Sequence, residues 1–272
     1  MTDTWRYIMG DNFHFGYFRT SGMNLSEATN ALIDELTKMG TITEDSKILD
    51  VGCGIGTPAF YLYEKFHCKI TGITNSERGL ELAQKTNEKK DTGKMVQFRL
   101  ADALNSGFPD GSFDVVWVME SSHLIMDKKN FFTECYRMLK SNGMILLCDV
   151  VSKIKMNLVI KILLKYKYKH IWESWELGTL DKTFGNSKTE TLKYYVKQLQ
   201  MTGFSKVIAR DISKETFPTL KYWRNNITHK KDKILQNLTK EKMEEFQLAC
   251  EILEVAFKFN ILSYGMIGAI KL

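Results

Sequence analysis

Short apolar runs alternate with amphipathic stretches along the middle of the chain. The runs are rich in β-branched or aromatic residues, as in strands buried on both faces. They are Lys47–Val51, Lys69–Thr74, Met95–Leu100, Phe113–Met119 and Met144–Val150. Helical spacing of apolar residues separates them, in Pro58–Phe66, Arg78–Lys89 and Asn130–Lys140. This order predicts a parallel α/β sheet with right-handed crossovers.

The pattern changes on both sides of this region. Before it, a helix is expected with Ser26 as N-cap and with Ala28, Leu32, Ile33 and Leu36 on one face. After it, Lys153–Ile171 reads as one long helix. Its apolar stripe is Ile154, Leu158, Ile162 and Tyr166, and its basic stripe is Lys161, Lys165 and Lys169. Two late strands are expected, Lys206–Asp211 and Tyr264–Leu272, separated by mostly helical sequence.

Composition narrows the class of protein. The chain has 272 residues, 44% of them hydrophobic, and a net charge of +6, which permits an anionic partner without requiring one. No run of about 18 apolar residues is present, so a transmembrane helix is not expected. The first residues lack the apolar core of a signal peptide. Five scattered cysteines, none in a CxxC pair, argue against disulfides and against a structural zinc site. We therefore expect a soluble cytoplasmic protein without a metal.

A glycine-rich loop carries the strongest chemical signal. Asp50-Val51-Gly52-Cys53-Gly54-Ile55-Gly56-Thr57-Pro58 follows the first strand and opens a helix, where glycines admit a ligand close to free backbone N–H groups. The dinucleotide pattern G-x-G-x-x-G fails, because Thr57 stands where its last glycine should be. Asp50 would also repel a pyrophosphate. The loop favours a ligand with a positively charged amino-acid end.

With these motifs the sequence resembles the class I S-adenosylmethionine (SAM) dependent methyltransferases. The resemblance covers most of Lys47–Val151 and also includes Gly72–Ser76, Ala101–Ala103, Phe108–Asp114 and Arg137–Gly143. It implies that the backbone at Gly52, Gly54 and Gly56 holds the methionine part of SAM, with Asp50 near the amino group. It further implies that Asp102 accepts a hydrogen bond from the adenine amino group and that the Ala103 backbone meets the ring.

One position departs from the common pattern of this family. Many members have an acid after the second strand for the ribose hydroxyls, whereas this chain has Thr74, Asn75 and Ser76. An asparagine can also bind two hydroxyls, without charge assistance. The substitution resembles a subgroup that acts on sterols, tocopherols and natural products.

The resemblance implies an α/β fold: a Rossmann-like, mostly parallel seven-stranded sheet flanked by helices, with a helical lid. Residues 1–45 would form an N-terminal helical segment that closes over the cofactor, and residues 46–150 the SAM-binding core. Residues 151–272 would supply the remaining core strands and the lid insertions, at about 151–190 and 215–260.

Candidate catalytic groups follow the fourth and fifth strands. Methyl transfer is an in-line displacement, and a positioned base helps when the nucleophile carries a proton. In an open α/β sheet such groups lie at the carboxyl ends of strands. His123 is the candidate base and Asp149 the carboxylate that orients it. The Glu-x-x-His pattern, with Glu120 as a cofactor-binding candidate, resembles sugar and indolocarbazole O-methyltransferases. Alternatively, His123 only packs at a helix start and Asp149 caps the next segment.

The N-terminal cluster Phe13–Phe18 resembles the segment that folds over the cofactor in the same subgroup. By that resemblance Tyr17 touches the methionine end, and His14 is a second catalytic candidate; simple packing is the alternative. Aromatic side chains of the lid would suit the walls of a pocket for an apolar or aromatic acceptor. The candidates are Trp172, Trp175, Phe184, Tyr222 and Trp223, and the alternative for each one is ordinary packing in the lid core. The lysine stripe is a solvated face, or it meets an anionic membrane or draws in an acidic substrate.

Other functions fit less well. Methyltransferases of exocyclic amines in nucleic acids carry an Asn/Asp-Pro-Pro-aromatic segment, which is missing after the fourth strand, and the basic residues are dispersed. Protein methylation, a non-catalytic SAM-binding module and an oxidoreductase on the same architecture stay open, because fold does not dictate function. The leading hypothesis is a SAM-dependent methyltransferase that modifies an O, N or C atom of a small molecule. No nucleic-acid partner and no membrane insertion are expected. The sequence leaves the oligomeric state open, a homodimer included.

Overall fold

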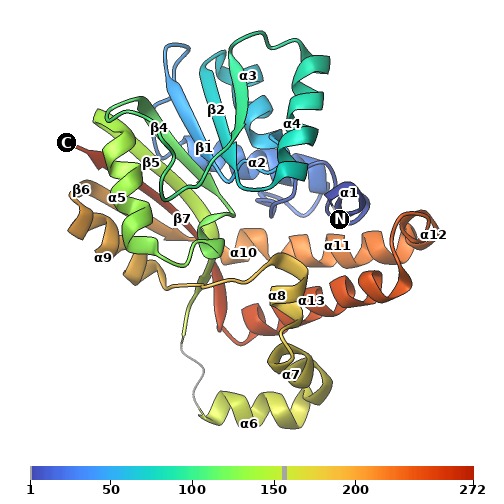
Figure 1. Ribbon diagram of the computed structural model, residues 1–272. Helices are drawn as coiled ribbons and strands as arrows, with labels where there is room; N and C mark the ends of the chain where they lie inside the picture. Colours follow the sequence, from blue (N-terminus) through green and yellow to red (C-terminus); the bar gives the residue numbers. More distant parts are fainter. Residues whose placement is uncertain (1, 155–157) are drawn as a thin grey trace.

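A seven-stranded sheet forms the centre of the protein (Figure 1). The computed structural model describes residues 2–154 and 158–272. The sheet order is β3-β2-β1-β4-β5-β7-β6, and only β7 runs antiparallel to its neighbours. The strands are β1 (Lys47–Val51), β2 (Lys69–Thr74), β3 (Val96–Leu100), β4 (Phe113–Met119), β5 (Leu139–Ser152), β6 (Phe204–Asp211) and β7 (Leu262–Lys271). The mostly parallel α/β sheet expected from the sequence is confirmed.

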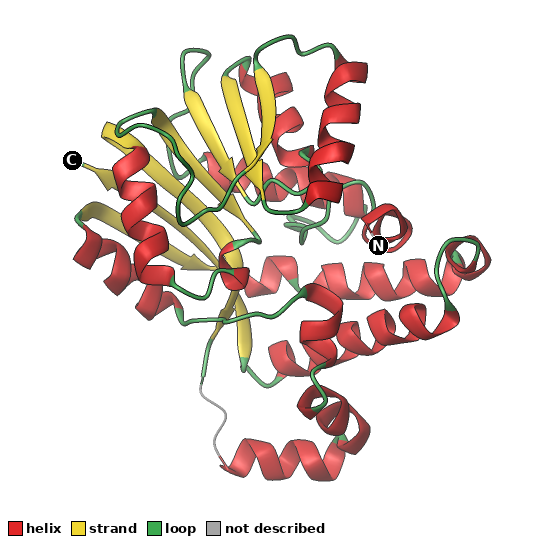
Figure 2. Ribbon diagram, in the orientation of Figure 1, coloured by secondary structure: helices red, strands yellow, loops and turns green. Residues whose placement is uncertain are grey.

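Helices cover both faces of this sheet (Figure 2). Neighbouring strand residues point to opposite faces, so Ile48 packs in one core and Leu49 in the other. The first core includes residues of the N-terminal helices and the lid; the second is closed mainly by α5 and α9. The flanking helices are α1 (Thr2–Met9), α2 (Leu25–Thr37), α3 (Thr57–Phe66), α4 (Glu77–Lys90), α5 (Lys128–Met138), α9 (Leu192–Thr202) and α10 (Ser213–Thr216).

Two helix starts differ from the expected ones. The N-cap of α2 is Asn24, not Ser26, because Asn24 and Glu27 form a reciprocal capping box: the Glu27 N–H donates to Asn24 Oδ1 at 3.0 Å, and the Asn24 N–H donates to Glu27 Oε2 at 2.9 Å. Helix α5 begins at Lys128, two residues before the expected Asn130, since Asp127 accepts the Asn130 N–H.

A helical lid lies beyond one end of the sheet (Figure 1). Its helices lie within residues 158–184 and 218–258, and they pack on the N-terminal segment: the ring centroids are 4.7 Å apart for Trp5 and Phe246 and 4.9 Å apart for Phe15 and Trp223. Among the described residues, no helix is both long and apolar enough to cross a bilayer. The lid helices are α6 (Leu158–Lys167), α7 (Lys169–Glu176), α8 (Thr179–Phe184), α11 (Pro218–His229), α12 (Lys231–Leu235) and α13 (Lys240–Lys258).

The long helix expected over Lys153–Ile171 is wrong in its extent. Strand β5 continues to Ser152, and the helical sequence divides at Tyr168 into α6 and α7. Residues 155–157 and the side chain of Leu158 lie outside the described part of the chain. The apolar stripe does not pack inward either, because Ile162 and Tyr166 are exposed.

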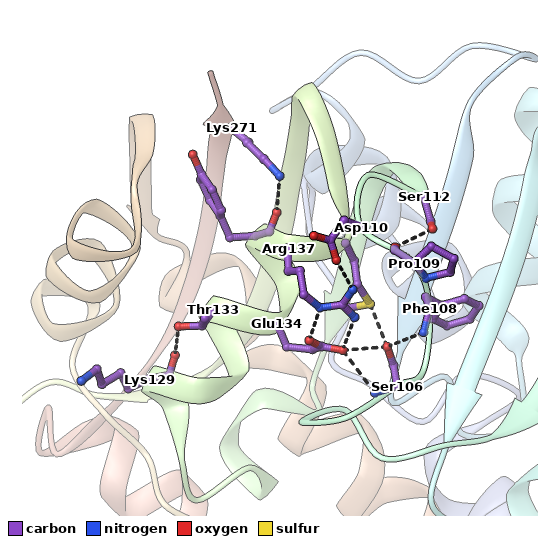
Figure 3. Close-up of polar contacts among 12 residues, drawn as sticks. Ser106, Phe108, Pro109, Asp110, Ser112, Lys129, Thr133, Glu134, Arg137 and Lys271 are labelled. Carbon is purple, nitrogen blue, oxygen red and sulfur yellow. Dashed lines mark hydrogen bonds and ion pairs between the residues drawn. The ribbon is translucent and has the colours of Figure 1, made fainter.

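The loop between β3 and β4 is held against α5 by a polar cluster (Figure 3). Arg137 of α5 donates to Glu134 at 2.8 Å and to Asp110 at 2.6 Å, and Glu134 accepts the Ser106 hydroxyl at 2.9 Å. The Arg137 guanidinium, with help from Ser106, keeps the pKa of Glu134 below its usual range despite partial burial. This cluster fixes the loop that carries Asp102 and Ala103.

Candidate active site

Two cavities meet between the sheet and the lid. One has a volume of about 590 Å³ and is lined by the glycine loop and the ends of β2, β3 and β4. The other, of about 680 Å³, is lined by the N-terminal segment, the turn after β4 and the lid. Phe13, Glu120 and Leu124 line both. A molecule in one cavity therefore adjoins a molecule in the other at these three side chains.

Asp50 gives the first cavity its main electrostatic feature. Asp50 is the last residue but one of β1. It is only 2% exposed, and its Oδ2 has no hydrogen-bond partner among the described residues. Burial raises the pKa of Asp50 to about 7. A buried, unpaired carboxyl oxygen at a cavity wall is costly unless a ligand supplies a cation or donor. The site therefore fits the positively charged amino group of the methionine part of SAM.

The loop glycines serve two different needs. Gly52 has φ +76°, and a Cβ there would lie 2.3 Å from Ser121 Cβ. Gly54 has φ +54°, but a Cβ on it would meet nothing within 4 Å. The first glycine is required for packing of the loop on the β4 turn, whereas the second leaves open space in the cavity wall.

This difference predicts that alanine will mainly lower stability at one position and mainly weaken SAM binding at the other. Gly52→Ala should lower the free energy of unfolding by about 2–4 kcal/mol, from left-handed strain plus overpacking. Gly54→Ala should cost only about 1 kcal/mol but should weaken SAM binding, because its methyl group enters the cavity. Urea denaturation and calorimetric titration measure the two quantities. Equal loss of stability in both variants would contradict this assignment.

The residues after β2 and β3 also line the first cavity, as the sequence predicted. Two of the three residues at the end of β2 stabilise the local structure. Ser76 caps α4 by accepting the Gly79 N–H at 3.0 Å, and Thr74 Oγ1 accepts the Ser76 N–H at 3.1 Å. Asn75 is exposed and forms no side-chain hydrogen bond with a described residue. It is thus the group best able to bind ribose hydroxyls. Asp102 uses Oδ1 to accept the Leu104 N–H at 2.9 Å, and Ala103 lies beside it.

The N-terminal segment contributes Phe13 and His14 to the first cavity, but not Tyr17. The Tyr17 backbone N–H donates to the Ala28 carbonyl of α2 at 2.7 Å, and the side chain packs against the first core. Its contact with the methionine end stays a prediction. His14 Nδ1 lies 2.7 Å from the Phe15 carbonyl and Nε2 has no partner among the described residues. Burial lowers the pKa of His14 to about 4, so the ring is neutral near pH 7. His14 does not line the second cavity.

Glu120 stands at the junction of the cavities with a strained backbone, φ +47°. Its Oε1 accepts the Phe15 N–H at 2.7 Å and the Tyr264 hydroxyl at 2.5 Å. Burial, aided by the nearby Asp149 charge, raises the pKa of Glu120 to about 8. Near pH 7 the carboxyl is mostly protonated, and since Oε1 already accepts twice, Oε2 can carry the proton and donate it.

His123 and Asp149 come together as predicted. His123 Nδ1 lies 2.7 Å from Asp149 Oδ1, and the His123 N–H donates to Oδ2 at 2.9 Å. The Asp149 carboxylate accepts the Nδ1 proton, which leaves Nε2 as the basic ring atom. His123 lines the second cavity only, whereas Asp149 is fully buried behind it. Asp149 therefore acts through His123.

The charges of this pair shift both pKa values. Burial works to lower the pKa of His123, but the charge and hydrogen bond of Asp149 outweigh it, and the pKa is raised. For Asp149, burial works in the other direction, and the His123 charge with hydrogen bonds from His123 and Ser122 holds the pKa below its usual value. The pair can store a proton as an ion pair.

Sequence reasoning missed the residues that hold these groups in place. Ser122 donates to Asp149 Oδ2 at 2.5 Å and lies 2.9 Å from the Tyr195 hydroxyl. Lys128 Nζ is buried and donates to the Ile125 and Lys188 carbonyls, which ties the His123 turn to the lid connection. No local pattern marks them, since their partners come from distant strands and helices.

The walls of the second cavity are largely apolar. Three of the five predicted lid aromatics, Trp175, Phe184 and Trp223, line it. The other two do not: Trp172 is buried within the lid, and Tyr222 donates its hydroxyl to the Met23 carbonyl. The described residues contain no group of three His, Cys, Asp or Glu that could hold a metal ion. All five cysteines are buried and free.

Comparison with known proteins agrees with this geometry. Residues 49–147 match the family described as "Methyltransferase domain". The 27-O-demethylrifamycin SV methyltransferase of Amycolatopsis mediterranei is 37% identical over 142 residues, which are 52% of each chain, so the match spans about half the length of that relative. The chloroplastic tocopherol O-methyltransferase of Arabidopsis thaliana is 28% identical over 98% of this chain and 78% of its own.

The fold also matches a solved structure over its whole length. The cyclopropane synthase MmaA2 of Mycobacterium tuberculosis superimposes with a TM-score of 0.87 at 17% identity, covering 100% of this chain and 94% of that one. With the domain match over the glycine loop and the strand ends, residues 49–147 of this chain form a methyltransferase domain of the SAM-dependent kind.

Proposed function

We propose that the protein transfers a methyl group from SAM to a small apolar molecule, and that His123 acts as the general base. One observation carries the proposal: the cavity that fits SAM and the apolar cavity meet at Glu120, and the His123–Asp149 pair serves only the apolar one. Such a division places donor and acceptor on opposite sides of one junction, as an in-line displacement requires.

The residues of the first cavity would hold SAM by its two ends. Asp50 would pair with the amino group, and Asn75 and Asp102 would bind the ribose and the adenine amino group. Phe13 and His14 would close the cavity from the N-terminal segment. When bound, SAM supplies an electrophilic methyl group on its sulfonium.

The second cavity would orient the acceptor and remove its proton. His123 Nε2 would accept a proton from a hydroxyl or other protonated nucleophile while Asp149 stabilises the imidazolium. Glu120, protonated near pH 7, would donate a hydrogen bond at the junction. Aromatic walls at Trp175 and Trp223 favour a ring-bearing acceptor. The named tocopherol and rifamycin relatives support this class, and the free thiols support a reducing compartment such as the cytoplasm.

Labelled SAM tests the proposal directly. Purified protein is incubated with methyl-labelled SAM and an extract of the source cells, which is then separated into small molecules, nucleic acid and protein. We expect label among the small molecules, and we expect it to disappear with Gly54→Asp, which fills the open space at the cofactor wall. Label confined to nucleic acid or protein would overturn the substrate class.

A further inference from the structure

Helix α6 lies at the outer end of the lid (Figure 1), and it exposes apolar side chains to solvent. Ile162, Leu163 and Tyr166 are 56%, 48% and 92% exposed, although each is a large apolar or aromatic side chain. Within the described part of α6 only Leu164 is buried, and it packs in the main core. A lid helix built only to cover the cavity would turn these residues inward.

The three exposed side chains form one continuous strip. Ile162 and Tyr166 are four residues apart and Leu163 and Tyr166 are three apart, so all three share a helix face. At about 100° per residue, Leu164 points nearly opposite to that strip. Within its described side chains, residues 161–167, the helix is thus anchored at Leu164 and presents its apolar strip outward.

Lysines border the strip on both sides. By helical spacing, Lys165 lies along one edge of the strip and Lys167 along the other, whereas Lys161 lies on the side of the helix near Leu164. None of the three forms an ion pair with a described carboxylate, whereas Lys169, the third lysine of the expected basic stripe, begins α7 and lies 3.9 Å from Glu173. The sequence from 158 to 172 contains no acidic residue. Lys165 and Lys167 lie over the Trp172 and Tyr168 rings, so their charges are not neutralised. An apolar strip between such cations is the pattern of a helix that lies in the interface of an anionic bilayer.

The position of α6 connects this face to the acceptor cavity. The chain passes from α6 through α7 to α8, and Trp175 of α7 and Leu180 of α8 line that cavity. A surface held by α6 would therefore lie next to the lid segments that cover the acceptor.

From the exposed apolar strip and its flanking lysines, we infer that α6 docks the protein on an anionic membrane surface. The face binds lipid headgroups and upper acyl chains without spanning the bilayer. Docking goes beyond methyl transfer and does not depend on it. The competing occupant is α6 of a second copy, for which the strip would supply an apolar contact but would bring like charges together.

Vesicle sedimentation tests the inference with the whole protein. We expect the protein to pellet with vesicles of two parts phosphatidylcholine to one part phosphatidylserine, and not with phosphatidylcholine alone. Lys165→Gln with Lys167→Gln should lower the partition coefficient about 30-fold, at about 1 kcal/mol per lysine. Ile162→Ser with Tyr166→Ser should weaken it at least about tenfold. The matched control, Lys85→Gln with Lys89→Gln on the exposed face of α4, should bind like wild type.

Three results would overturn the inference. The first is equal pelleting with neutral and anionic vesicles, and the second is an equal loss in the α4 control. The third is a dimer in analytical ultracentrifugation that Ile162→Ser with Tyr166→Ser converts to monomer, since the strip would then be covered by a second copy. Thermal stabilisation by S-adenosylhomocysteine shows that each variant is folded, and it separates failure of docking from failure of the SAM site.

Discussion

Replacing His123 with alanine should lower kcat for methyl transfer by about 10²- to 10⁴-fold, the usual contribution of a positioned base, and leave the Kd for SAM unchanged. His123 lines the acceptor cavity but not the cofactor cavity, so its loss removes proton transfer without touching SAM. Steady-state kinetics and calorimetric titration of the same preparation measure the two quantities. A variant with the wild-type kcat would remove His123 from the mechanism.

The pH dependence distinguishes a base from a merely structural histidine. His123 accepts a proton only when its imidazole is neutral, so kcat/KM should rise with pH, with a midpoint above the ordinary pKa of about 6.5 because Asp149 raises it. Asp149→Asn removes the charge and leaves burial, which lowers the pKa of His123; the rising limb should then move to lower pH, with a lower plateau. A limb that stays in place in Asp149→Asn would contradict the pairing as the cause of the shift.

Replacing Asp50 with asparagine should weaken SAM binding by about 30-fold or more, since truncating one partner of a buried charge pair costs at least about 2 kcal/mol. The carboxyl is buried and Oδ2 has no hydrogen-bond partner in the described part of the chain, so we expect the amino group of SAM to pair with it. Calorimetric titration of Asp50→Asn measures the loss. Asp45→Asn, an exposed carboxylate before β1, is the matched control and should bind SAM normally. Equal affinity in both variants would place the amino group elsewhere.

The same substitution should change how the stability of the ligand-free protein depends on pH. The pKa of Asp50 is raised from 3.8 to about 7 in the folded state, so between these values the folded protein keeps a proton that the unfolded chain releases. Proton binding by Asp50 stabilises the folded state fully below about pH 4. This contribution to the free energy of unfolding, about 4 kcal/mol, is lost as the pH rises through 7. Asp50→Asn does not titrate, so it should become more stable than wild type by this amount near pH 8. Urea denaturation of both proteins at each pH measures the difference between their free energies of unfolding. The titration of Glu120 cancels in this difference because both proteins contain it. A difference that stays the same at every pH would contradict the burial argument.

The sequence predicted the parts of the site that depend on local order along the chain. Three strands have their predicted bounds, because short β-branched runs between turns define them. His123 and Asp149 follow adjacent strands, and the sheet then brings them within 2.7 Å. Glycine spacing and Pro58 placed the loop, since backbone geometry allows few residues there.

The remaining parts depend on contacts between distant segments. Tyr264 reaches Glu120 only because β7 inserts antiparallel beside β5, which pairs Val150 with Tyr264. Tyr17 is absent from the lining of the first cavity, and its backbone hydrogen bond joins two segments, Tyr17 and Ala28 of α2, whose contact no local pattern marks. The sequence also did not predict that the apolar face of α6 points outward. Its apolar spacing fits a helix that packs inward equally well, and only the tertiary structure shows which face is covered.

Calorimetric titration of the purified protein with S-adenosylhomocysteine, and separately with NAD, tests the central claim most directly. The product analogue keeps the amino group that Asp50 should meet, and it requires no knowledge of the acceptor. We expect one S-adenosylhomocysteine to bind per chain and NAD not to bind, because Thr57 replaces the last glycine of the dinucleotide pattern. Binding of NAD without S-adenosylhomocysteine, or of neither, would contradict the assignment of the cofactor cavity and the methyltransferase activity proposed from it.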